Sequence, residues 1–192
     1  MRIIAGRWKG RKLLAPPGIS TRPTAERARQ ALFDMLWHAP WAGREVIEEA
    51  RVLDVFAGTG AYGLEALSRG AAHATFLENE PAAQAMIRAN IAACPGAVGQ
   101  LFPANALKPP RAGQACSLVF LDPPYGQGLL EPALAALDAA GWFAPGALIC
   151  AELGPKDTLE AAGFEEVAVR AHGKARLHIL RAAPKPDDHP AG

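Results

Sequence analysis

Four residues that could bind an amino group follow a strongly apolar run at 117–121. They are Asp122-Pro123-Pro124-Tyr125. Two successive prolines fix the backbone and remove two N–H donors, so acceptor groups dominate this segment. The Asp122 carboxylate and the Pro123 carbonyl could hold both hydrogens of an exocyclic amine on a base and leave its lone pair aimed at a methyl group. Tyr125 could stack on that base, which is worth about 1–3 kcal/mol.

A second candidate site is a glycine-rich loop earlier in the chain. Gly58, Gly60 and Gly63 have the GxGxxG spacing, and Glu78 lies 20 residues after Gly58 at the end of the next apolar run. Glycines let the backbone turn sharply and approach a ligand closely. An acid at the second strand end accepts hydrogen bonds from ribose hydroxyls. This spacing fits a nicotinamide dinucleotide as well as other adenosine cofactors.

The residues before the glycines favour one class of cofactor. Asp54 lies four residues before Gly58, where its charge would repel a pyrophosphate but attract a cationic sulfonium and its amino acid. Phe56 and Ala57 make the loop longer than the tight turn that cradles phosphates. We therefore favour S-adenosylmethionine over a dinucleotide. A nicotinamide-dependent oxidoreductase stays open as an alternative, because GxGxxG alone is weak.

Both motifs must be placed by a sheet. Helical patterns cover 25–38, 61–69, 81–93 and 129–140. Apolar runs that predict strands cover 52–56, 74–78, 99–102, 117–121, 147–152, 166–170 and 176–181. This alternation predicts an α/β fold with a doubly wound, mostly parallel seven-stranded sheet. Ligands bind such sheets beyond the carboxyl ends of the strands, where strand order reverses. A reversal beside the first strand would bring both motifs into one crevice.

The charge of the chain is concentrated at its beginning. Residues 1–30 carry eight basic side chains and one acid, whereas the remaining 162 carry 12 basic and 18 acidic ones. This basic arm is interleaved with Trp8 and lies beside an acidic body, so we expect it to contact a polyanion. The expected phosphate contacts are Arg2, Arg7, Lys9, Arg11, Lys12, Arg22, Arg27 and Arg29.

The local structure of the arm follows from its glycines and prolines. Short stretches at 2–5 and 12–15 flank glycines and predict a small hairpin, which a Pro-Pro-Gly run ends. Thr24 is predicted to cap the following helix. Ala28, Leu32, Met35 and Leu36 should line the packed face of that helix, with its arginines projecting elsewhere. A turn at 172–174 is predicted between the last two strands.

Composition excludes several classes of protein. The 192 residues are half hydrophobic and contain no run of 18 apolar residues, which argues against a membrane protein. The first residues lack the apolar core of a signal peptide, so we expect a cytoplasmic protein. The three cysteines are widely spaced, without a CxxC pair, and should be buried small side chains. No metal site is expected.

The sequence resembles a known family. Asp122-Pro-Pro-Tyr125 with the glycine loop is similar to class I methyltransferases that modify amino groups. The resemblance narrows to the bacterial RsmD family through residues 1–13, 22–33, 54–69 and 120–125, and it extends over residues 1–155. It implies a Rossmann-like S-adenosylmethionine-dependent enzyme that methylates the N2 amine of a guanine in 16S ribosomal RNA. The partner would be that RNA or the assembling small subunit. Apart from the resemblance, we expect a monomer.

The resemblance also implies roles and boundaries. The methionine end of the cofactor would lie against Asp54, Gly58 and Gly60, and its ribose against Glu78. Its adenine edge would meet the side-chain oxygen of Asn105 and the amide of Ala106, although many class I enzymes have aspartate at the position of Asn105. Asp122, Pro123 and Tyr125 would hold the guanine. Residues 1–43 would form a basic RNA-binding extension, 44–183 the methyltransferase domain and 184–192 a frayed tail.

Three alternatives remain at this point. A DNA adenine-N6 or cytosine-N4 amino-methyltransferase would share both motifs, but the chain shows no separate target-recognition domain. A nicotinamide-dependent oxidoreductase would make Asp122-Pro-Pro-Tyr125 accidental. A non-catalytic RNA-binding module would leave the cofactor crevice without a use. Stabilisation by S-adenosylhomocysteine, the reaction product, but not by NAD would separate these classes.

Overall fold

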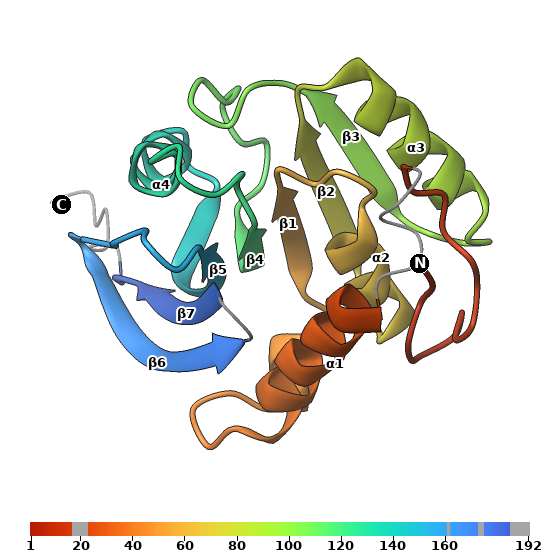
Figure 1. The fold of residues 1–192 in the computed structure, drawn as a ribbon, viewed down its shortest axis with the longest axis horizontal. Coiled ribbons are helices and arrows are strands. Elements are labelled where there is room, and N and C mark those ends of the chain that lie inside the picture. The colour runs from red at the N-terminus through yellow and green to blue at the C-terminus, as the bar shows by residue number, and fades with distance from the viewer. Residues whose placement is uncertain (17–22, 161, 173–174, 185–192) are drawn as a thin grey trace, which may run out of the picture.

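The computed structural model describes residues 1–16, 23–160, 162–172 and 175–184. Its centre is one seven-stranded sheet with the order β3-β2-β1-β4-β5-β7-β6 (Figure 1). The strands are β1 Arg51–Val55, β2 His73–Glu78, β3 Gly99–Pro103, β4 Cys116–Leu121, β5 Phe143–Leu153, β6 Phe164–His172 and β7 Ala175–Ala182. The predicted doubly wound, mostly parallel sheet is confirmed.

The strand order reverses at β1. This strand pairs in parallel with β2 on one side and with β4 on the other. Val55 is paired with Leu121, so the glycine loop after β1 and Asp122 after β4 leave the sheet at the same edge. This pairing of β1 with β4 therefore brings the two motifs together, as the prediction of a shared crevice requires. β7 pairs antiparallel with both β5 and β6.

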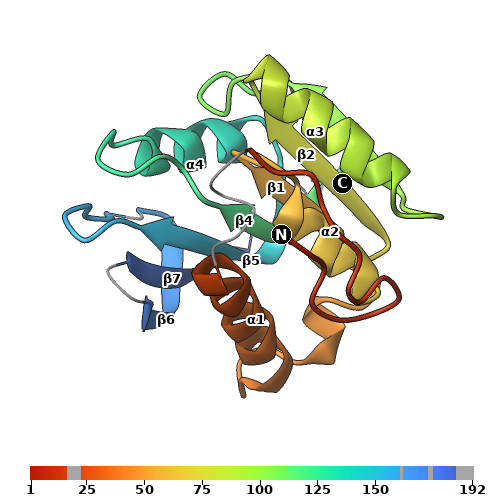
Figure 2. The same cartoon turned by 45° about the vertical axis from the view of Figure 1, so that its right-hand side comes forward.

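Helices cover both faces of the sheet (Figure 2). They are α1 Pro23–His38, α2 Ala61–Ser68, α3 Pro81–Ala92 and α4 Leu130–Ala139, with a short 3-10 turn, η1, at Arg44–Val46. Successive strand side chains point to opposite faces. Val52 and Phe120 thus pack in one cluster with α1, α2 and α3, whereas Leu53 and Val119 pack in another with α4.

The N-terminal hairpin forms as predicted, with one antiparallel bridge between Arg2 and Lys12. It does not project as a free arm, because it packs on α2. The buried carboxylate of Glu65 accepts the amides of Ile4 and Ala5 at 2.8 and 3.0 Å. At Gly6, whose φ is +77°, a Cβ would lie 1.8 Å from the carbonyl oxygen of Ser68, so only glycine fits this contact.

Trp8, which lies among the basic residues of the hairpin, is not a surface residue. Trp8 is 7% exposed, and its indole N–H donates to the carbonyl of Pro95 at 3.2 Å, while its amide donates to Ser68 Oγ. A buried tryptophan with a satisfied N–H is a packing anchor. Trp8 therefore attaches the hairpin to the segment that follows α3.

Two predictions about α1 need correction. The helix begins at Pro23, so Thr24 lies inside it and is not its cap. The most buried positions are Arg29, Leu32, Phe33 and Leu36, which have the spacing of one helix face. Met35 is only partly buried beside this stripe. Arg29 thus lies on the packed face rather than projecting to solvent.

Most remaining boundaries agree with the sequence to within a few residues. β5 is longer than the predicted 147–152, and its irregular first half pairs with β4 through a register shift. Cys94, Cys116 and Cys150 are free and buried, as predicted. The predicted turn at 172–174 cannot be compared in full, because Gly173 and Lys174 lie outside the described residues, as does the tail from 185. In the described ranges, no helix is long and apolar enough to cross a membrane.

Candidate active site

A cavity of about 720 Å³ opens at the carboxyl ends of the central strands. This volume is in the range of small-molecule and cofactor sites. Its walls come from the glycine loop, the ends of β4 and β5, and the N-terminal extension. Among the lining residues are Met1, Pro16, Ala28, Arg29, Asp54, Phe56, Gly58, Thr59, Tyr62, Met86, Asp122, Tyr125 and Glu152.

Three residues of the glycine loop that follows β1 have left-handed backbone angles. Phe56, Gly58 and Gly60 have φ values of +57°, +55° and +75°, and Gly58 borders the cavity. Only glycine adopts this region without cost, so Phe56 is held there by its surroundings. The Glu78 carboxylate accepts the amide of Gly58 at 2.8 Å and that of Glu80 at 2.8 Å. Glu78 thereby joins the loop to the end of β2.

Asp54 is the most buried acid of the cavity. Its side chain accepts the amide of Gly63 at 2.9 Å, and the residue is 2% exposed. Burial raises the pKa of Asp54 to about 8, against the lowering effect of that amide, and the negative charges of Asp122 and Glu78 raise it further. A carboxylate held in such surroundings favours a neighbouring cation strongly.

Asp122 and Tyr125 both border the cavity, as predicted. Asp122 is exposed as a residue, but partial loss of water around its carboxyl group in the cavity raises its pKa to about 7, and the negative charge of Glu152 raises it further. Tyr125 is 51% exposed at the cavity mouth, and its hydroxyl donates to the Glu152 carboxylate. The loss of water raises the pKa of Tyr125, and the hydrogen bond to Glu152 raises it further.

The other predicted ligands lie less directly in the cavity. Pro123 is buried and borders a smaller neighbouring cavity with Pro124. Asn105 is exposed after β3, where its side-chain oxygen accepts the amide of Leu107 at 2.9 Å. Ala106 is 4% exposed and packs in the core cluster of α4. In the described part of the chain, the predicted cofactor residues that do not line the large cavity are Gly60, Glu78, Asn105 and Ala106.

The predicted phosphate contacts divide into three groups. Arg29 is 2% exposed, donates to the carbonyl of Arg2 and pairs with Glu65 at 3.6 Å, so it is not a surface phosphate contact. Arg22 lies outside the described residues. The others are exposed, namely Arg2, Arg7, Lys9, Arg11, Lys12 and Arg27.

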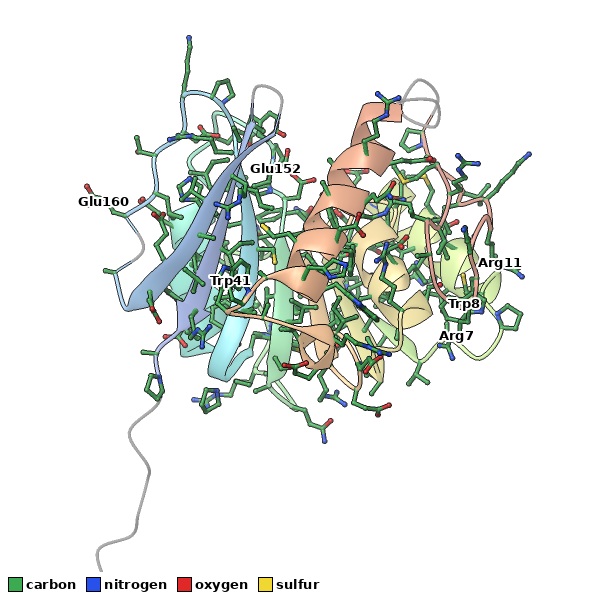
Figure 3. All side chains as sticks on the ribbon, turned by 90° about the horizontal axis from the view of Figure 1, so that it is seen from below. Arg7, Trp8, Arg11, Trp41, Glu152 and Glu160 are labelled. Atoms are coloured by element: carbon green, nitrogen blue, oxygen red, sulfur yellow. The ribbon has the colours of Figure 1, made fainter. Side chains whose placement is uncertain are left out.

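The exposed cations of the hairpin do not all lie beside the cavity. Arg7 and Arg11 donate to the carbonyls of Gly96 and Ala93, which come just after the end of α3. α3 begins near the cavity and is 12 residues long, so these two arginines are about 18 Å further along the protein. Figure 3 shows Arg7, Trp8 and Arg11 together on one side of the molecule, far from Glu152.

The N-terminal extension nevertheless forms part of the cavity wall. Met1 and Pro16, near the two ends of the hairpin, both line it. Asn90, a buried residue of α3, accepts the amide of Leu14 at 2.7 Å and donates to the carbonyls of Leu14 and Thr59 at 3.0 and 2.9 Å. One amide group thus connects the extension to the glycine loop.

Sequence reasoning missed three residues of the site. Glu152 ends the predicted fifth core strand, so its position beside the strand of Asp122 was a usable signal. Tyr62 lies between Gly60 and Gly63 and lines the cavity, with its ring stacked on Phe120 at 5.2 Å between centroids. Asn90 is a single amide on a helix, and nothing in its local sequence marks it.

Known proteins that are similar to this chain indicate its family. Residues 1–181 match the family described as "Conserved hypothetical protein 95". The chain is 42% identical over 153 residues to the ribosomal RNA small subunit methyltransferase D of Escherichia coli K12, covering 79% of this chain and 74% of that protein. The chain belongs to the RsmD family. The Haemophilus influenzae methyltransferase of the same name is 36% identical to this RsmD-family chain over 157 residues. The match covers 79% of this chain and 78% of that protein.

The fold agrees with this assignment. The solved structure of yhhF from Escherichia coli superposes with a TM-score of 0.79 at 35% identity, and 96% of this chain and 99% of that chain are covered. The sheet order 3-2-1-4-5-7-6 is that of class I methyltransferases. The predicted family, Rossmann-like fold and methyltransferase class of this RsmD-family chain are confirmed. A nicotinamide-dependent oxidoreductase and a non-catalytic module are thereby excluded.

Proposed function

We propose that the protein transfers a methyl group from S-adenosylmethionine to the exocyclic N2 amine of a guanine in 16S ribosomal RNA, as free RNA or in the assembling small subunit. The observation that carries this proposal is the convergence of Asp54 and Asp122 on one cavity. Asp54 lies near the end of β1, and Asp122 directly follows the parallel neighbour β4. The two acids suit a cationic cofactor and an amine, respectively. Relatives named as ribosomal RNA small subunit methyltransferase D support the RNA substrate.

The cavity residues fit the cofactor. The left-handed turn at Gly58 leaves its Cα open, because a Cβ there would meet only one backbone oxygen at 3.9 Å. Asp54 supplies a carboxylate inside the cavity, and Phe56 and Met86 supply apolar surface. Glu78 supplies acceptor oxygens next to the cavity, where it holds the amide of the lining residue Gly58. When bound, S-adenosylmethionine supplies an electrophilic methyl group on a positively charged sulfur. We assign Asp54, Gly58 and Gly60 to its methionine end, Glu78 to its ribose, and Asn105 and Ala106 to its adenine.

The target base would enter from the side of Tyr125. A base inside a helix must be flipped out to reach such a cavity. The ring of Tyr125 offers a stacking surface at the mouth, and Asp122 accepts one amine hydrogen, with the Pro123 carbonyl proposed for the other. The amine nitrogen would bond to the methyl carbon as the bond between that carbon and the cofactor sulfur breaks, which leaves S-adenosylhomocysteine. The nitrogen would then lose one proton, for which Asp122 is the neighbouring acceptor. Because a guanine amine is a weak nucleophile, orientation must supply much of the acceleration, up to about 7–11 kcal/mol.

The RNA backbone would follow the exposed basic residues. A cavity of about 410 Å³ between the hairpin and α1 is lined by Arg2, Lys9 and Arg27 among others. We propose that residues 1–43 bind RNA while also walling the active site, so the extension and the domain 44–183 act as one unit. Six exposed cations, each neutralising one phosphate, would make RNA affinity fall steeply with salt. A flat salt dependence would contradict this role.

The deciding experiment measures labelled methyl transfer from S-adenosylmethionine to three substrates: unmodified small subunits, naked small-subunit RNA and duplex DNA. Digestion to nucleosides should give N2-methylguanosine from RNA or from subunits. Label found only in DNA as methyladenine or methylcytosine would refute the RNA substrate and keep the chemistry. Asp122→Ala should nearly abolish turnover with little change in cofactor affinity by calorimetry. Lost cofactor binding would reassign Asp122 to the cofactor site.

A further inference from the structure

We infer that Glu152 is a positioning residue of the target site, which orients the Tyr125 ring through their hydrogen bond and sets the charge of Asp122 beside it. This inference rests on the proposed function, because Tyr125 and Asp122 are the residues that would hold the base. Nothing in the motif itself identifies Glu152, since it lies 30 residues after Asp122 in sequence.

The sheet places the two carboxylates side by side. Leu121 of β4 is paired with Ala151 of β5, so Asp122 and Glu152 occupy the next positions on neighbouring parallel strands. Such strands lie about 4.8 Å apart. Both side chains line the same cavity. In Figure 3, Glu152 lies at the end of its strand on the side that faces α1.

The Tyr125 hydroxyl donates to Glu152, and this contact fixes the ring from its far end. The near end is fixed by the loop after β5, because a Cβ on Gly154 would lie 3.1 Å from two Tyr125 atoms. Asp157 joins the same two loops, as its carboxylate accepts the amides of Gly126 and Gly154 at 3.2 and 3.0 Å. A half-exposed tyrosine is thus held in one orientation before any base arrives, which lowers the entropic cost of stacking.

Glu152 also acts on Asp122 by its charge. The titratable and charged groups around Asp122 come from several elements: Arg29 on α1, Asp54 on β1, Tyr62 on α2, Glu152 on β5, and Tyr125 and Asp157 in the adjoining loops. Among them, Glu152 is the charge that raises the pKa of Asp122. A carboxylate with a raised pKa is a better acceptor for an amine hydrogen and for the proton that leaves after transfer.

Three substitutions separate the two effects. Glu152→Gln keeps an oxygen that accepts the Tyr125 hydroxyl but removes the charge. Glu152→Ala removes both, and Tyr125→Phe removes only the hydroxyl. Glu160→Gln is a charge-matched control, because Glu160 is an exposed acid of the following loop and lies well away from Glu152 (Figure 3). Calorimetry with S-adenosylhomocysteine shows for each variant whether the cofactor site is intact.

Methyl transfer to unmodified small-subunit RNA is then measured between about pH 5.5 and 9, with kcat and KM determined separately. We expect Glu152→Ala and Tyr125→Phe each to raise KM for RNA by roughly tenfold. The double variant should raise KM little further, because the two substitutions remove the same hydrogen bond, between Tyr125 and Glu152. Glu152→Gln should keep KM within roughly threefold and move the acid limb of the profile to lower pH. Effects of Glu152→Ala and Tyr125→Phe that multiply fully would overturn the orienting role.

A second readout needs no substrate. The side-chain carbon of Asp122 is titrated by NMR in the cofactor-free wild type, in Glu152→Gln and in Glu160→Gln. We expect a lower pKa for Asp122 only in Glu152→Gln, and an unchanged pKa there would overturn the electrostatic role. If wild-type protein methylated no guanine, the proposed function would fail, but this titration would still decide whether Glu152 sets the charge of Asp122.

Discussion

Replacing Asn90 with alanine tests whether the N-terminal extension is held to the glycine loop by one buried side chain. Asn90 is 1% exposed and makes three hydrogen bonds, two to Leu14 and one to Thr59. Each is worth about 0.5–1.5 kcal/mol net. Water can satisfy part of the exposed Leu14 backbone, and alanine is the better helix former by about 0.5 kcal/mol. We therefore expect a loss of about 2 kcal/mol.

For a domain of this size, that loss lowers Tm by roughly 4–8 °C. Calorimetric melting of the cofactor-free protein measures it, with Arg88→Ala as the control, because Arg88 is exposed on the same helix. Hydrogen exchange should show faster exchange at the Leu14 amide in Asn90→Ala only. An unchanged Tm, or a lower Tm with normal exchange at Leu14, would refute the reasoning.

Three further predictions follow from other contacts. Gly63→Ala should lower the free energy of unfolding by about 1–2 kcal/mol in urea titrations, because a Cβ would lie 2.4 Å from the Phe76 ring; unchanged stability would show that the ring moves freely. Asp54 has a folded pKa of about 8, above its ordinary 3.8, so its contribution to stability is present below about pH 4 and is lost as pH rises to 8. Asp54→Asn should therefore flatten the decline in Tm of the free protein over that range and weaken S-adenosylhomocysteine binding roughly tenfold, the equivalent of about 1.4 kcal/mol; a decline as steep as in wild type would contradict the burial argument. The double variant Lys9→Ala/Lys12→Ala should reduce the slope of log affinity for RNA against log salt by about 2, measured by filter binding at several salt concentrations, and an unchanged slope would remove both lysines from the RNA surface.

The sheet and the two motifs were predictable because each depends on local patterns. Apolar runs of strand length marked β1, which carries Asp54, and β4, which Asp122 follows, and glycine spacing marked the loop between β1 and α2. The parallel topology then placed both acids at one edge, since strand order in such folds is limited to few arrangements. The cavity followed from that topology without any knowledge of side-chain packing.

The errors concern groups whose environment is set by contacts distant in sequence. Arg29 has the i, i+3, i+4 and i+7 spacing that joins it to Leu32, Phe33 and Leu36, so its burial was readable in principle. Its partner Glu65, however, lies 36 residues away on α2. Trp8 is likewise buried by a segment near residue 95. Counting charges along the sequence places every arginine on the surface, because the count does not show which arginines pair with a buried acid.

The docking of the N-terminal hairpin has a consequence for the order in which this chain can fold during its synthesis. Residues 1–16 are synthesised before the groups that hold them, which are Glu65 and Ser68 on α2, Asn90 on α3 and the carbonyls of residues 93–96. About half of the polypeptide must therefore emerge before the hairpin has a surface to pack on. Until then its hydrophobic anchor Trp8 remains exposed, and this interval is when the nascent chain is most open to misfolding or to capture by a chaperone.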